Sequence, residues 1–113
     1  MVIIVTGGRD NDDVEYICES LENLHLHNQP ITKLIHGGAK GTDAIAGLWA
    51  EQKGIDVIVC PADWNKHGLA AGPIRNKEML KYNPDYVVAF KGGKGTDNMI
   101  YNAINAGYQV IYL

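Results

Sequence analysis

The stretch ITKLIHGGAKGTD, residues 31–43, decides the fold, because it is typical of a strand, a glycine turn and a helix start in direct succession. The same order occurs twice more, as MVIIVT-GGRD at 1–10 and as YVVAFK-GGKGTD at 86–97. Glycine lets backbone N–H groups approach a ligand, and a helix N-terminus adds free N–H donors with partial positive charge. Three such turns in one small chain predict a site for a phosphorylated ligand.

Apolar runs alternate with helical patterns along the rest of the chain. The expected strands are residues 2–5, 31–35, 55–60, 86–90 and 108–113. The expected helices run from Asp12 or Asp13 to about His25, from Thr42 or Asp43 to Gly54, from Gly72-Pro73 to Asn83, and from Thr96 or Asp97 to Gly107. Strict alternation indicates a parallel sheet covered on both faces. We therefore predict an α/β fold for residues 1–113, a single Rossmann-like domain: a three-layer αβα sandwich with a five-stranded parallel sheet in the order 3-2-1-4-5.

The helical patterns also predict which side chains face the sheet. The expected inward residues include Ile17, Leu21, Trp49 and Met99, together with Val14, Leu48, Ile74 and Ile104. Cys18 and Cys60 fit the pattern of small buried hydrophobes, and neither has the spacing of a metal ligand.

In the predicted order, the strands that precede the Gly-Gly pairs are the three adjacent central ones. Ligands of such sheets bind beyond the carboxyl ends of the strands, where the strand order reverses. The three turns should therefore converge on one crevice. The residues predicted to bind the ligand there are Gly7, Gly8, Arg9, Asp10, Gly37, Gly38, Lys40, Gly41, Thr42, Asp43, Gly92, Gly93, Lys94, Gly95 and Thr96.

A long connection, PADWNKHGLAAGPIRNKEM at 61–79, completes the predicted site. Trp64 in it suits either stacking on a base or burial in the core, and Asp63 precedes it. Arg75 and Asn76 fall in the first turn of the third helix, where the helix dipole disfavours a cation, so Arg75 is a candidate ligand-binding or catalytic group. His67 has no assigned role, and His36 at the end of a strand is expected to be structural.

Composition and charge narrow the functional class. The 113 residues are 46% hydrophobic with a net charge of −3, which is ordinary for a globular protein and argues against a dedicated nucleic-acid binder. No apolar run approaches a membrane span, and the first residues do not form a signal sequence, so we expect a cytoplasmic protein. The glycine turns match neither a Walker A loop nor G-x-G-x-x-G, and no metal or other cofactor is expected.

Four blocks together carry a family resemblance: VTGGRD at 5–10, HGGAKGTD at 36–43, the 61–79 connection and FKGGKGT at 90–96. They resemble the SLOG superfamily, in particular its small bacterial and phage proteins of the YspA kind. Other branches of that superfamily include the LOG-type phosphoribohydrolases and the Rossmann domain of DNA-processing protein A. The resemblance spans nearly the whole chain and implies a nucleotide or nucleotide-derived ligand.

The resemblance also implies roles for individual residues. Arg75 matches the arginine of the R-x-x-M helix that serves the LOG active site, and the 92–96 turn matches the LOG phosphate loop. LOG enzymes carry a glutamate three residues after the threonine, and here that position is Met99. If the chain is an enzyme, the carboxylates that could replace that glutamate are Asp97, Asp10 and Glu78.

Three functions follow in order of preference. The first is binding of a nucleotide-derived small molecule by a sensor or sequestering module. The alternative is a LOG-like nucleoside 5′-monophosphate phosphoribohydrolase, an N-glycosidase, and the third is DNA binding. LOG-type relatives pair through helices, so a homodimer or larger homo-oligomer is a further expectation, with Tyr82, Tyr101 and Tyr112 as candidate interface residues.

Overall fold

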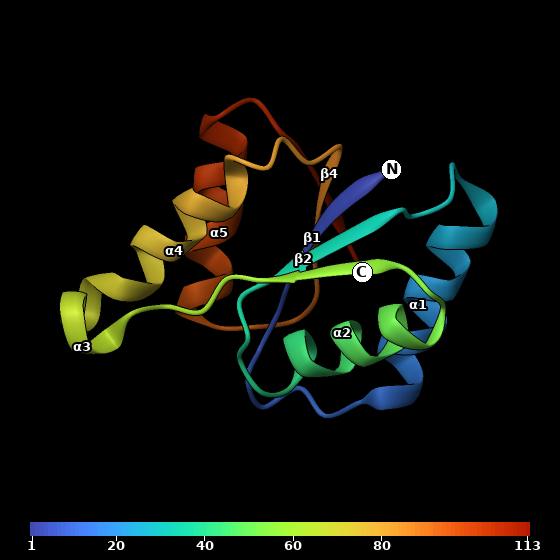
Figure 1. Cartoon of the computed structure of the whole chain (residues 1–113), viewed down its shortest axis with the longest axis horizontal. Helices are drawn as coiled ribbons and strands as arrows, with labels where there is room; N and C mark the ends of the chain where they lie inside the picture. The colour runs from blue at the N-terminus through green and yellow to red at the C-terminus, as the bar shows by residue number, and fades with distance from the viewer.

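Five parallel strands form the central sheet of the computed structural model, which describes residues 1–113 (Figure 1). Their order across the sheet is β3-β2-β1-β4-β5, which confirms the predicted Rossmann-like class and strand order. The bounds are β1 (Val2–Thr6), β2 (Lys33–His36), β3 (Asp56–Val59), β4 (Tyr86–Ala89) and β5 (Gln109–Tyr112). The order reverses between β1 and β4, which places a crevice at the carboxyl end of these two strands.

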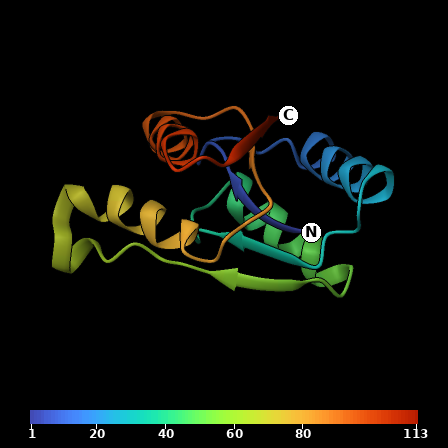
Figure 2. The same ribbon diagram turned by 90° about the horizontal axis from the view of Figure 1, so that it is seen from above.

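Helices cover both faces of this sheet. The helices α1 (Val14–His27) and α2 (Thr42–Gln52) lie on one face, and α4 (Ala71–Leu80) and α5 (Lys94–Asn105) lie on the other (Figures 1 and 2). Ile3 and Val5 pack toward the α1–α2 side, whereas Ile4 packs toward the α4–α5 side. None of the helices combines the length and the apolar character that crossing a bilayer requires.

Four residues expected to face the sheet do not. Val14, Leu48, Ile74 and Ile104 are 56%, 60%, 38% and 56% exposed. Leu48 illustrates the reason: the buried stripe of α2 is formed by Ala46, Gly47, Trp49 and Ala50, and at 100° per residue Leu48 lies on the opposite side of the helix. Cys18 and Cys60 are only partly buried, and each packs against the edge of a core cluster.

The long connection contains elements that the sequence reasoning missed. A short helix α3 (Trp64–His67) and a 3₁₀ turn η1 (Gly68–Ala70) precede α4, and they lie at the end of the molecule farthest from β1 and β2 (Figures 1 and 2). The Asp63 side chain accepts the N–H of Lys66 at 3.1 Å and so caps α3. A Gly68 with a φ of +56° ends that helix.

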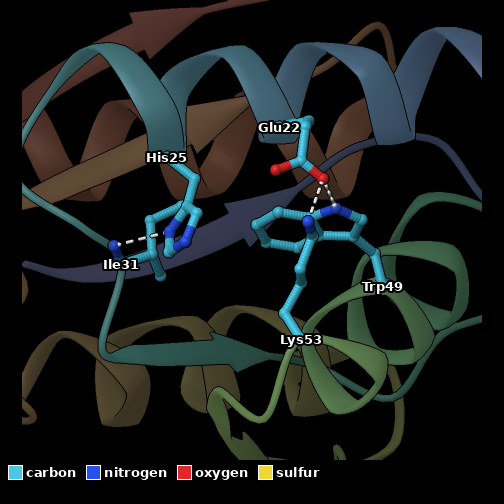
Figure 3. Close-up of polar contacts among 5 residues, drawn as sticks. All are labelled: Glu22, His25, Ile31, Trp49 and Lys53. Carbon is cyan, nitrogen blue, oxygen red and sulfur yellow. Dashed lines mark hydrogen bonds and ion pairs between the residues drawn. The ribbon is translucent and has the colours of Figure 1, made fainter.

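A polar cluster joins α1 to α2 on the far side of the sheet from α4 (Figure 3). Glu22 Oε1 accepts hydrogen bonds from Trp49 Nε1 at 3.4 Å and from Lys53 Nζ at 2.5 Å. The His25 ring meets the Trp49 ring edge-on at 5.8 Å, and its Nδ1 accepts the Ile31 N–H at 3.0 Å. The cluster therefore fixes the two helices and the turn before β2 together.

The Glu22→Gln variant is expected to lose part of the acid sensitivity of the fold. Lys53 above all, and then Trp49, hold the pKa of Glu22 below its ordinary value of 4.5. A depressed carboxyl pKa stabilises the folded state above the ordinary value, and this contribution disappears as the pH falls through the folded pKa. The thermal midpoint of the wild type should therefore fall more steeply below pH 4.5 than that of Glu22→Gln. Glu19→Gln, an exposed neighbour on α1, is the control; identical pH profiles for the two variants would contradict the assignment.

Candidate functional site

A cleft of about 1000 Å³ lies beyond the carboxyl ends of β1 and β4. The turns after these two strands form its floor, and α3, η1 and the start of α4 form its opposite wall. Its volume is at the upper end of the range usual for small-molecule sites. The place is the one that the strand order predicts for a ligand.

Most of the predicted site residues meet in this cleft, and the rest come chiefly from one turn. The predicted residues that line it are Gly7, Gly8, Arg9, Asp10, Asp43, Trp64, Arg75, Asn76, Gly92, Gly93, Lys94, Gly95 and Thr96. The predicted residues that do not line it are Gly37, Gly38, Lys40, Gly41, Thr42, Asp63, Asp97 and Glu78. The turn after β2 thus supports the cleft more than it faces it.

The turn after β2 satisfies its own amides. The Asp43 Oδ2 accepts the N–H of Gly37 at 3.1 Å and of Ala39 at 3.3 Å, while Gly38 donates to His36 Nδ1 at 2.9 Å. An internal carboxylate therefore takes the position that an anionic ligand would occupy in an open turn. These three N–H groups are not available to a ligand.

Burial sets the ionisation of the two side chains in this turn. It raises the pKa of the Asp43 carboxyl, against the lowering effect of the Ala39 N–H. It lowers the pKa of His36, whose Nδ1 accepts a backbone N–H and so carries no proton. His36 is 6% exposed, as expected of a structural histidine.

Direct hydrogen bonds connect the three glycine turns to one another. Thr42 donates to the Gly8 carbonyl from its N–H at 3.2 Å and from its Oγ1 at 3.1 Å. Gly8 in turn donates its N–H to the Lys91 carbonyl at 2.8 Å. The fully buried Thr42 therefore connects the turn after β2 to the turn after β1, and the Gly8 amide already has a protein acceptor.

The turn after β4 differs, because its amides have no protein acceptor. The backbone N–H groups of residues 92–96 form no hydrogen bond within the chain, and they lie just before and within the first turn of α5. Asp97, which corresponds to Asp43 in the near-copy sequence, is exposed to solvent and does not fold back onto them. Thr96 is 5% exposed and lines the cleft, yet its hydroxyl has no hydrogen-bond partner. This turn is the candidate anion site.

Arg75 is held rigidly at the side of the cleft. Its Nη1 donates to the carbonyls of Gly37 at 2.7 Å and Cys60 at 3.4 Å, and its Nε donates to Asn76 Oδ1 at 3.0 Å. A Cβ at Gly37 would collide with the guanidinium, so a larger residue there would displace Arg75 from this position. Burial lowers the pKa of Arg75, but an arginine stays protonated in proteins. Its Nη2 has no acceptor in the chain.

Trp64 lies on the wall of the cleft and not in the core. It is 47% exposed, and the Arg9 Cζ lies 5.7 Å from the centre of its ring, a cation–π distance. Leu69, which the sequence reasoning missed, also lines the cleft and is 94% exposed. No motif marks Leu69, because its place depends on the unforeseen turn η1. Other lining residues outside the prediction include Asn11, Asp12, Asp13, Lys91 and Asn98.

The parallel sheet and the glycine-lined cleft at its switch point define a Rossmann-like α/β protein. Residues 1–67 match the family model described as "YspA, cpYpsA-related SLOG family". The chain belongs to this family. It is also 37% identical to the Gene 61 protein of Mycobacterium phage D29 over 96% of this chain and 93% of that protein.

Two solved structures share the fold. The crystal structure of TM1055 superposes with a TM-score of 0.72 at 20% identity, covering 96% of this chain and 71% of that one. DNA processing protein A (DprA) from Streptococcus pneumoniae gives a TM-score of 0.52 at 16% identity, covering 96% of this chain and 57% of that one. At these identities the likeness concerns the fold alone.

Proposed function

We propose that the cleft binds a nucleotide or nucleotide-derived ligand, with a phosphoryl group seated on the first turn of α5. Thr96 carries the proposal: it lines the cleft, its hydroxyl makes no hydrogen bond within the chain, and it lies among free amides, although the residue as a whole is only 5% exposed. A hydroxyl that no protein group engages is free to donate a hydrogen bond to a phosphate oxygen. The helix N-terminus favours the same charge.

The other lining groups suit the remaining parts of a nucleotide. The exposed ring of Trp64 offers a surface on which a base can stack. Asp10 also lines the cleft and can accept hydrogen bonds from ribose hydroxyls. Membership of the SLOG family supports a nucleotide-related ligand.

The position of Met99 favours binding over glycoside hydrolysis. Met99 stands where LOG enzymes have their glutamate, and its side chain is fully buried in the core on the inner face of α5. The substitutes Asp97 and Glu78 both lie outside the cleft, and Glu78 pairs with Lys81 at 3.0 Å. Of the three carboxylates that could replace the LOG glutamate, only Asp10 lines the cleft. We therefore favour a sensor or sequestering module over a hydrolase.

The charge of the cleft mouth disfavours DNA as the ligand. Asp10, Asp12 and Asp13 line the side formed by the turn before α1, and the whole chain has a net charge of −3. A continuous phosphodiester backbone would be repelled there, whereas a free nucleotide can turn its phosphate toward α5.

The Thr96→Val variant tests the proposal. Titration calorimetry against mononucleotides, cyclic nucleotides and ADP-ribose-type compounds should identify a ligand, and its binding should change the fluorescence of Trp64. Thr96→Val should bind that ligand about tenfold more weakly, because one hydrogen bond to a charged group is lost. Its thermal stability should not decrease, since the hydroxyl has no partner in the free protein.

Thr96→Ser keeps the hydroxyl and is the matched control. It should retain wild-type affinity within about threefold, because its hydroxyl can reach the same phosphate oxygen. A folded wild-type protein that binds no member of the panel would refute the proposed function. Chromatographic detection of released free base would instead support the N-glycosidase alternative.

A further inference from the structure

We propose that the ligand carries two directly linked phosphoryl groups, as a nucleoside diphosphate or a pyrophosphate-bridged nucleotide does, and that Arg75 and Arg9 hold the second group. The proposal rests on the proposed function, which accounts for the first phosphoryl group at α5. It adds a second anion subsite on the α4 side of the same cleft.

Arg75 keeps one edge of its guanidinium free. Three hydrogen bonds to Gly37, Cys60 and Asn76 use its Nη1 and Nε, and Nη2 has no acceptor in the chain. An arginine whose other donors are fixed is pre-organised, so little conformational entropy is lost when the remaining N–H groups bind an anion. Guanidinium donors also match phosphate oxygens in geometry and charge.

The positive charge of this subsite is not neutralised by an ion pair. The ion pairs of the structure are Lys53–Glu22 and Lys81–Glu78, so Arg9 and Arg75 have no carboxylate within ion-pair distance. Asp43 attracts Arg75 more strongly than Arg9 repels it, but Asp43 forms no ion pair with the guanidinium and its Oδ2 accepts two backbone amides. Arg9 is close enough to Arg75 to lower its pKa by repulsion. An anion between the two guanidinium groups would relieve that repulsion.

Asn76 places this subsite directly beside the first. Its Oδ1 accepts from Arg75 Nε at 3.0 Å, and its Nδ2 donates to the carbonyl of Gly95, in the first turn of α5, at 3.2 Å. One buried amide group therefore connects the guanidinium to the turn that presents the free N–H groups. Such adjacency fits phosphoryl groups joined through one oxygen better than groups at opposite ends of a nucleotide.

The test compares adenosine 5′-monophosphate with adenosine 5′-diphosphate by titration calorimetry at constant ionic strength. The wild type should bind the diphosphate about tenfold more tightly, because Arg75 Nη2 and Arg9 add charge-assisted hydrogen bonds. Arg9→Gln and Arg75→Lys should each reduce diphosphate affinity about tenfold and monophosphate affinity less than about threefold. Arg9 is exposed, so its replacement should not unfold the protein.

Lys77→Gln is the matched control, since it removes one positive charge from α4 at an exposed position outside the cleft. It should leave the preference for the diphosphate unchanged. If the monophosphate binds and the diphosphate binds no more tightly, the second subsite is refuted while the proposed function stands. If both arginine variants keep the wild-type preference, the subsite is also refuted. If neither nucleotide, nor any other in the panel, binds the folded protein, both proposals fail.

Discussion

Replacing Gly92 by alanine is expected to reduce nucleotide binding by about 30-fold or more, the loss of at least about 2 kcal/mol of charge-assisted hydrogen bonding. A Cβ at Gly92 would collide with Thr96 Oγ1 and would lie 2.8 Å from the backbone nitrogen of Gly8. The hydroxyl and the amides that we assign to the phosphate would therefore be displaced or covered. Calorimetry with the ligand found in the panel measures the effect.

The neighbouring Gly93→Ala variant separates this effect from a general response to mutation of the turn. A Cβ at Gly93 meets no atom within 4 Å, and its φ of −108° lies outside the left-handed region. Gly93→Ala should therefore bind within about threefold of the wild type. Circular dichroism and thermal unfolding would establish that both variants are folded. Wild-type affinity in a folded Gly92→Ala would exclude the first turn of α5 as the phosphate site.

The sequence predicted the architecture because its signals are local and repeat along the chain. Runs such as residues 2–5, apolar at every position, indicate strands buried on both faces, and alternation with helical patterns leaves few topologies. The strand order and the convergence of the turns after β1 and β4 followed from these rules. Arg75 could be singled out because a cation at a helix start breaks a local preference.

The sequence did not reveal that the two near-identical turns differ in role. GGAKGTD at 37–43 and GGKGTD at 92–97 differ by one residue, yet Asp43 turns inward onto its own amides and Asp97 stays in solvent. The backbone follows a different path in the two turns, because the turn at 37–43 contains one residue more than the turn at 92–97. The amino-acid composition of the turns does not reveal that difference in path. Helix α3 was missed for a similar reason: its four residues have no periodicity to detect.

The fixed relation between the turns leads to the prediction with the largest effect on stability. Gly41 has a φ of +74° and a ψ of −126°, a region that only glycine adopts readily. A Cβ there would also collide with the Arg9 carbonyl oxygen and lie 2.6 Å from that of Gly8. Gly41→Ala should therefore lower the free energy of unfolding by about 3 kcal/mol or more, through backbone strain combined with overpacking.

Gly54→Ala measures the cost of a positive φ without a collision. Gly54 has nearly the same φ, +73°, but no atom lies within 4 Å of its Cβ position. It should cost only about 1 kcal/mol, the usual penalty for a side chain in the left-handed region. Denaturant unfolding of the two variants measures the difference. Equal losses would mean that the contact between the turns after β1 and β2 adapts to a Cβ, and would contradict a rigid connection between these two turns.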